Sequence, residues 1–441
     1  MADTPYFITA EELVKREKKK DTGGSGMKNI PPELVSNTHL IYSSPATLAF
    51  HSPGAEGFGV KRAGLAIPDS IMLLVAPGCC GRNTSALSTL GTDRERFFYL
   101  LMDETDIVTG RHLKKIPQAV QEICEIQKKM PSVVMICITC VDALLGTDME
   151  RVCRKAEELV QIPVRPCYMY ALTREGRKPP MVHVRQSLYS LLEKKAAKEI
   201  SVNLLGYFAP LIDECELPQI LGQLGVEKTR EISTCRDYEE YLRMGEASFN
   251  LVLNPEARFA AQDMNQRIAI PYAELFRLYQ LDKIQNQYHL FAKALGGKIS
   301  DQDWYDKTSQ QIQKFCSKYP ELKVSIGGTL NANAFELAVA LIRYGFQVKE
   351  IFANLGEEDY VYLRKIAELS PDTRIYSNLE PTMLYYDCSS EDVDLTIGKD
   401  AKWYHPDKPN LPWNQDKQPF GYGGLQLLFT QLTRLLEENH H

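Results

Sequence analysis

The sequence predicts an α/β protein with three Rossmann-like lobes, in which mainly parallel sheets are flanked by helices. The first observation is a set of short runs rich in Val, Ile and Leu, at residues 71–76, 133–138, 202–207, 249–253, 324–326 and 395–397. Strands that helices cover on both faces have such continuously apolar sequences. The second observation is that longer stretches with apolar residues at helical spacing separate these runs, at residues 113–129, 149–161 and 333–344. Alternation of this kind is typical of α/β folds.

The first 37 residues are predicted to form an N-terminal arm. A charged run that can form a helix extends from Glu11 to Lys20, and Gly23 to Gly26 reads as a flexible link. Two roles remain open for this arm, namely a solvated tail and a segment that wraps around a partner.

Two fresh starts divide the rest of the chain. Residues 202–206 follow a Lys-rich helical stretch, and residues 323–328 begin a strand whose following helix ends at Tyr344, before Gly345. A glycine just beyond a helix is a common stop signal. The predicted lobes are residues 38–198, 199–320 and 321–419, followed by a C-terminal helix at 420–439.

The composition of the chain argues against some classes of function and some cellular compartments. The formal net charge of −6 argues against a general nucleic-acid binder, which normally carries a basic surface. No stretch approaches the roughly 18 consecutive apolar residues of a membrane span. The charged first 20 residues contain no apolar core of the signal-peptide type. We therefore expect a cytoplasmic protein that binds neither nucleic acid nor membrane.

Most of the eleven cysteines are expected to be structural. In a reducing compartment, cysteines are more often buried thiols or metal ligands than disulfides. Three of them, Cys124, Cys153 and Cys316, fall within amphipathic helical stretches, where a thiol acts as a small apolar group. Four more have no recognisable partner in the sequence: Cys167, Cys215, Cys235 and Cys388.

The remaining four cysteines follow two predicted strands of the first lobe. Cys79 and Cys80 come after the run at 71–76, and Cys137 and Cys140 come at the end of the run at 133–138. Ligands bind at the carboxyl ends of parallel strands, and the glycines beside Cys79 and Cys80 let backbone approach a bulky group. Chemistry alone leaves an iron–sulfur cluster, zinc, a thioredoxin-type redox pair and buried thiols open.

The context of these cysteines resembles a known family. Residues 75–80 resemble a His-Gly-Pro-x-Gly-Cys pattern, and residues 139–148 resemble a Thr-Cys followed by an Ile-Gly-Asp helix start. Between them, residues 103–111 resemble a Glu-x-Asp-Ile-Val-Phe-Gly-Gly segment. These are motifs of the nitrogenase component 1 superfamily. The resemblance implies that Cys80 and Cys140 are ligands of an iron–sulfur cluster.

The resemblance extends over about residues 38–438. The starts of the second and third lobes, at 202–206 and 323–328, resemble the corresponding starts in this family. Residues 418–424, which precede the closing helix, resemble its C-terminal Gly-Tyr-x-Gly motif. Because the motifs occur in the order and spacing of the family, together they support the resemblance more strongly than any single motif does.

The first cluster cysteine of the family has no counterpart here. Residues 50–57 occupy its expected place, and His51 and Ser52 are the nearest candidates. Histidine can ligate iron in some iron–sulfur centres, although an ordinary polar role is also open for His51. The resemblance therefore implies a [4Fe–4S] cluster that Cys79, His51 or a partner chain completes.

Two ligands of the family's molybdenum cofactor are also missing. Phe420 stands where a cofactor-binding histidine precedes the Gly-Tyr motif, and residues 270–274 offer no match for the cofactor cysteine. We therefore do not expect dinitrogen reduction.

The resemblance implies a nitrogenase-like oxidoreductase subunit with an iron–sulfur cluster at a subunit interface. It would accept electrons from an ATP-dependent iron protein and reduce an unknown substrate. The chain lacks a P-loop, so nucleotide hydrolysis would belong to that partner. A homologous component 1 subunit would complete a homo-oligomer or an α2β2-type assembly. Two alternatives remain, a metallocluster assembly scaffold, which is not an enzyme, and a cluster-free structural subunit.

Overall fold

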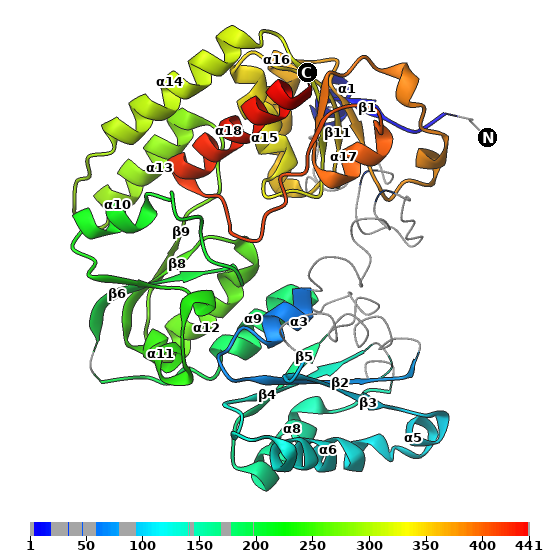
Figure 1. Cartoon of the computed structure of the whole chain (residues 1–441), viewed down its shortest axis with the longest axis vertical. Coiled ribbons are helices and arrows are strands. Elements are labelled where there is room, and N and C mark those ends of the chain that lie inside the picture. The colour runs from blue at the N-terminus through cyan, green and yellow to red at the C-terminus, as the bar shows by residue number, and fades with distance from the viewer. Residues whose placement is uncertain are drawn as a thin grey trace. The chain divides into compact units, whose positions relative to one another are not determined.

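The computed structural model describes residues 4–18, 34, 46, 59–78, 94–139, 141, 145–168, 178–196 and 198–439. These residues form three sheets flanked by helices, and all strand pairs but one are parallel (Figure 1). The α/β prediction with mainly parallel sheets is confirmed. No helix of the described residues is long and apolar enough to cross a membrane.

The first sheet has the strand order β3-β2-β4-β5. Its strands are β2 (Ile71–Ala76), β3 (Phe97–Leu101), β4 (Val134–Ile138) and β5 (Val164–Tyr168). Alternate side chains of a strand point to opposite faces, so each strand contributes to two cores. One core includes residues of α6 (His112–Ile126) and α8 (Met149–Val160). The other includes residues of α3 (Gly59–Gly64) and α9 (Pro180–Tyr189), which lie on the opposite face (Figure 1).

The second sheet has the order β7-β6-β8-β9. Its strands are β6 (Glu199–Leu205), β7 (Lys228–Arg230), β8 (Ala247–Val252) and β9 (Tyr272–Glu274). The helices in the same compact unit as this sheet are α11 (Tyr238–Leu242) and α12 (Arg258–Ile268), whereas α10 (Leu217–Gln223) belongs to the unit of the third sheet. Buried residues of α12, such as Met264, belong to the same core cluster as α9.

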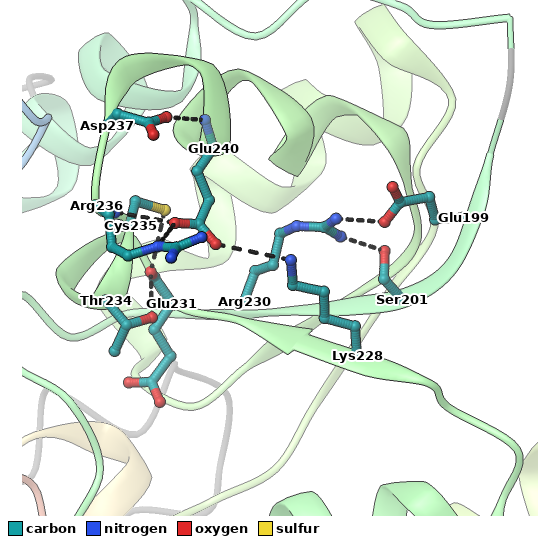
Figure 2. A network of polar contacts seen from close by, with 10 residues as sticks. All are labelled: Glu199, Ser201, Lys228, Arg230, Glu231, Thr234, Cys235, Arg236, Asp237 and Glu240. Carbon is teal, nitrogen blue, oxygen red and sulfur yellow. Dashed lines mark hydrogen bonds and ion pairs between the residues drawn. The ribbon is translucent and has the colours of Figure 1, made fainter.

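A polar network holds the outer strand β7 of this sheet (Figure 2). The buried guanidinium of Arg230 donates to Ser201 Oγ at 2.6 Å and to the carboxylate of Glu199. Beyond the strand, Glu240 accepts from the backbone N–H of Arg236 at 3.0 Å. Short edge strands expose backbone groups, and the two bonds from Arg230 fix β7 against β6.

The third sheet has the order β1-β12-β11-β10-β13-β14. Its strands are β1 (Ile8–Thr9), β10 (Lys323–Gly327), β11 (Gln347–Phe352), β12 (Arg374–Tyr376), β13 (Leu395–Ile397) and β14 (Asn410–Leu411). The accompanying helices are α1 (Ala10–Lys18), α13 (Leu281–Ala294), α14 (Gln302–Lys318), α15 (Ala334–Arg343), α16 (Tyr360–Leu369), α17 (Lys399–Tyr404) and α18 (Gly421–Asn439).

The beginning of the chain is part of this third sheet. Strand β1 pairs antiparallel with β12, with Ile8 opposite Ile375. Helix α1 packs on α16, and Glu17 accepts from Arg364 Nε at 3.1 Å. Within residues 4–18, Ile8–Thr9 therefore form an edge strand of the third sheet and Ala10–Lys18 form a helix that packs on α16. This segment is not a solvated tail.

The chain divides into two compact units. One contains the described residues of 1–52, 211–224 and 277–441, and the other those of 53–210 and 225–276. Helices α13 and α14 thus belong to the same compact unit as the third sheet. The boundary expected near residue 320 would instead have placed them in the second lobe. Aromatic packing accounts for this grouping, because Phe315 of α14 contacts Phe429 of α18 and Phe346, which follows α15.

Candidate functional site

The candidate cluster site lies where two neighbouring strands of the first sheet end. Strands β2 and β4 are parallel neighbours, with Val75 opposite Ile138. Pro77 and Gly78 continue the chain beyond β2, and Thr139 follows β4. The segments that carry the predicted cysteines therefore start side by side at the carboxyl edge, where parallel sheets bind ligands.

The predicted ligands themselves, Cys79, Cys80, Cys140 and His51, lie outside the described residues. The structure thus brings together the strand ends that precede these cysteines, and the arrangement of the ligands stays a prediction. Within the described part of the chain, no group of three or more His, Cys, Asp or Glu residues is placed to hold a metal ion.

Thr139 is an unusual residue at this edge. Its side chain is buried, with 4% exposure, and its Oγ1 has no hydrogen-bond partner among the described residues. A buried hydroxyl without a partner costs about 1–3 kcal/mol. Such an atom, next to a predicted cluster ligand in the sequence, fits a site that receives a further group.

A short helix follows the neighbouring strand β3 at the same edge. Helix α5 (Glu104–Thr109) is capped by Asp103, whose carboxylate accepts from the backbone N–H of Asp106 at 2.7 Å. It ends at Gly110, whose φ of +68° is favourable for glycine. The segment that resembles the Asp-Ile-Val motif is therefore a helix itself, followed directly by α6.

Asp106 joins α5 to α6 through a buried carboxylate. Lys115 Nζ lies 2.5 Å from its Oδ2, and Arg111 Nε donates to Oδ1 at 3.0 Å. The hydrogen bond from Lys115 is the main reason that the pKa of Asp106 falls to about 2. His112 Nδ1 lies 3.0 Å from the carbonyl oxygen of Asp106, so this nitrogen carries the proton and donates. The helix pair is thus fixed by charge and by hydrogen bonds.

Large apolar side chains are exposed near the same edge. Val108 on α5 is 85% exposed, and Leu101, at the end of β3, is 56% exposed. Leu113 and Leu145 are also exposed. Single exposed apolar residues are common, but several around one sheet edge favour a protein interface.

Cys137, the first member of the Cys-x-x-Cys pair, is a core thiol. It is fully buried on β4 and lies opposite Cys167 on β5. Burial raises the pKa of Cys137 well above its ordinary value, whereas metal binding requires a thiolate. A zinc site or a thioredoxin-type redox pair built on Cys137 and Cys140 would need the Cys137 thiolate, so the burial of Cys137 argues against both alternatives. Cys124 and Cys153 are buried as expected, and Cys316 is half-buried.

A second hollow lies at the carboxyl edge of the third sheet. It has a volume of about 260 Å³ and is lined by the loop after β10 and by residues that follow β11, β12 and β13. Asp400 accepts from the backbone N–H of Gly328 at 2.8 Å, from that of Thr329 at 3.1 Å and from Asn378 Nδ2 at 2.8 Å. None of the lining residues is Cys or His, so the hollow offers no soft metal ligand.

Asn333 organises the opposite wall of this hollow. Its Oδ1 accepts from two backbone N–H groups in the first turn of α15, and its Nδ2 donates to Asp359 Oδ1 at 2.6 Å. Sequence reasoning missed the roles of Asp400 and Asn378. The glycine pair that begins the third lobe was the available signal, because a Cβ at Gly327 would lie 2.0 Å from Asp400 Oδ1.

The C-terminal Gly-Tyr motif is also structural. Phe420 is buried, and Gly421 has a φ of +62°. The buried carboxylate of Glu216 accepts from the backbone N–H groups of Tyr422 and Gly423, at 2.8 and 2.9 Å. Phe420 is therefore a packed core residue in the place where the resemblance expects a metal ligand.

The fold agrees with the comparisons to known proteins. The family model for nitrogenase component 1 type oxidoreductases matches residues 56–437, and the chain belongs to this family. The superfamily predicted from the sequence is thus confirmed.

Individual members of the family are also similar to this chain over most of its length. The chain is 24% identical over 417 residues to the nitrogenase iron-molybdenum cofactor biosynthesis protein NifE of Sinorhizobium fredii (strain NBRC 101917 / NGR234), covering 88% of this chain and 82% of that protein. It is 24% identical over 407 residues to NifE of Clostridium pasteurianum, covering 88% and 85%. Among solved structures, nitrogenase Cp1 at pH 6.5 matches with a TM-score of 0.69 and 16% identity over 94% of this chain and 97% of that chain. That likeness shows the fold.

Proposed function

We propose that this protein is a metallocluster assembly scaffold, which binds an iron–sulfur cluster at the edge of the first sheet and passes it to an acceptor protein. The observation that carries this proposal is the adjacency of β2 and β4, because Cys80 and Cys140 follow their ends. The likeness to two cofactor biosynthesis proteins over 88% of the chain favours a scaffold over the electron-accepting reductase expected from the sequence.

The thiolates of Cys80 and Cys140 would hold the cluster. Iron–sulfur clusters are bound mainly through cysteine thiolates, and these stay reduced in a compartment such as the cytoplasm. A [4Fe–4S] cluster would need further ligands, which Cys79, His51 or a partner chain would supply. The orphan hydroxyl of Thr139 supports a further group at this edge. When bound, the cluster supplies iron and sulfide for transfer.

The incomplete ligand set supports transfer. A thiolate of an acceptor protein can displace the ligand of an iron site that no thiolate of this chain holds, and cluster release requires such an exchange. Phe420 is packed in the core in the place where the resemblance expects a cofactor-binding histidine, and for this reason the proposal does not include dinitrogen reduction.

The partners would meet the edge of the first sheet. A homologous component 1 subunit, in a homo- or hetero-oligomer, would cover exposed apolar side chains such as Val108 and would complete the cluster ligands. An ATP-dependent iron protein would supply electrons during cluster maturation.

Anaerobic measurement of iron and sulfide tests the ligands. We expect wild-type protein to contain both, and Cys80→Ala and Cys140→Ala to lose most of the iron. Cys316→Ala is the matched control, because Cys316 lies on α14 in the other compact unit, and it should keep the iron. Equal iron in all variants would refute the ligand choice, and stoichiometric zinc without iron would refute the cluster.

Cluster transfer tests the scaffold. The loaded protein, mixed with a cluster-free acceptor of the same family, should lose iron as the acceptor gains it. Sustained substrate reduction with the iron protein and ATP, without loss of iron, would instead favour the reductase.

A further inference from the structure

The two edges of the first sheet differ in how the hydroxyls beside its strands are hydrogen-bonded. At the amino edge, Ser70 Oγ donates to Gly64 O at 3.3 Å and accepts from Arg96 Nη2 at 3.0 Å. Ser132 Oγ, which precedes β4 at the same edge, donates to Pro68 O at 2.5 Å. At the carboxyl edge, Thr139 Oγ1 is buried without a partner among the described residues. The sheet thus satisfies its hydroxyls at one edge and leaves one unsatisfied at the edge of the candidate site.

Thr139 also occupies a central position at that edge. It directly follows β4, which lies between β2 and β5, and it directly precedes Cys140. With only 4% of its surface exposed, its hydroxyl cannot rely on bulk water. A threonine hydroxyl has one rotatable O–H donor, and the sulfurs of an iron–sulfur cluster accept hydrogen bonds.

We propose that Thr139 donates a hydrogen bond to a sulfur of the bound cluster, either a sulfide or the Cys140 thiolate, and thereby raises the reduction potential of the cluster. This inference rests on the proposed function. A hydrogen bond to sulfur stabilises the more negative, reduced state of a cluster, which makes the potential less negative. Thr139 is in this sense a positioning residue that tunes the cluster without ligating it.

The decisive variants are Thr139→Val, which keeps the branched shape and removes the donor, and Thr139→Ser, which keeps the donor. Thr308→Val is the control, because Thr308 is buried on α14 and its hydroxyl is already bonded to Trp304 O. The midpoint potential of each iron-loaded protein is measured by anaerobic redox titration, with the reduced cluster followed by electron paramagnetic resonance.

We expect Thr139→Val to keep its iron and to shift the potential to a more negative value. Thr139→Ser and Thr308→Val should keep the wild-type potential. A potential that does not move in iron-loaded Thr139→Val would overturn this inference and leave the scaffold proposal intact. Wild-type protein without iron would overturn both.

A second measurement uses the metal-free protein. If Oγ1 has no protein partner, Thr139→Val removes an unsatisfied buried hydroxyl and should unfold at the same temperature as wild type or a higher one. Thr308→Val, which loses a satisfied hydrogen bond, should unfold at a lower temperature. A clear loss of stability in metal-free Thr139→Val would show that the hydroxyl bonds to the protein, and would refute the proposal.

Discussion

The carboxyl edges of the first and third sheets differ in how their polar groups are satisfied. In the third sheet, Asp400 takes three N–H donors and Asn333 bonds to Asp359, so the walls of the hollow are paired with one another. In the first sheet, a buried hydroxyl lacks a partner within the described residues, and the next residue is a predicted cluster ligand. Parallel sheets offer a crevice at this edge in both cases. This difference is why we propose a ligand site at the edge of the first sheet and not at the hollow of the third.

The two edges also hold buried carboxylates in the first turns of their helices. Asp106 on α5 faces the cations Lys115 and Arg111, which lower its pKa to about 2. Glu336 on α15 accepts only from N–H donors, namely those of Tyr279 and Gln280, and burial raises its pKa to about 7. Neighbouring charge therefore decides the sign of the shift, because both side chains are inaccessible to solvent.

The largest expected effect comes from Asp400→Ala, which leaves the N–H groups of Gly328, Thr329 and Asn378 without their acceptor. We expect the free energy of unfolding to fall by about 3 kcal/mol or more, since three N–H donors lose their acceptor at about 1–3 kcal/mol each. The three tryptophans, Trp304, Trp403 and Trp413, all lie in the unit that contains this sheet. Urea unfolding followed by tryptophan fluorescence therefore measures the change. The exposed Asp407→Ala is the control, and equal losses in both variants would contradict the role of Asp400.

A smaller effect is expected from Glu336→Gln, and it depends on pH. Because the folded protein holds a proton on Glu336 up to a pKa of about 7, against an ordinary 4.5, wild-type stability should fall between these two pH values. Glu336→Gln should remove this fall of about 2–3 kcal/mol and gain relative stability at pH 8 compared with pH 5. Thermal unfolding at several pH values measures the difference. The exposed Glu357→Gln should follow wild type, and a parallel pH profile in Glu336→Gln would refute the shift.

The smallest effect is expected from Asp106→Asn, because the partner cations are partly exposed. The lowered pKa of Asp106 stabilises the folded state above the ordinary value of 3.8, and this stabilisation is lost as the pH falls toward 2. Asp106→Asn should therefore be less stable than wild type at pH 6, with the gap closing as the pH approaches 2. Urea unfolding followed by circular dichroism tests this, with the exposed Glu104→Gln as control. A gap that widens in acid would contradict the assignment.

Local sequence signals predicted the central strands and helices. The runs at 71–76 and 395–397 match β2 and β13 residue for residue, and the helical stretch predicted from residue 333 is α15, of which Asn333 is the N-cap. The sequence placed the cysteines at the ends of two strands of one lobe, and the structure shows that these two strands are neighbours. Continuously apolar runs and capping residues act over a few positions, so they are readable without tertiary contacts.

Features that depend on distant partners were not predictable. Strand β1 has two residues and exists through its pairing with β12, and Asp400 acts on a loop some 70 positions earlier in the chain. The sequence also could not show whether Cys137 is a core thiol or a metal ligand. Only its burial in the structure distinguishes the two roles in a Cys-x-x-Cys pair.

The pairing of β1 with β12 determines when this edge of the third sheet can form during translation. Thr9 leaves the ribosome 365 positions before its partner Arg374 (374 − 9). At roughly 5–20 residues per second, about 20 to 70 seconds separate the two. Strand β1 can therefore pair only after β12 has been made, so this edge of the third sheet forms long after its first strand has been translated.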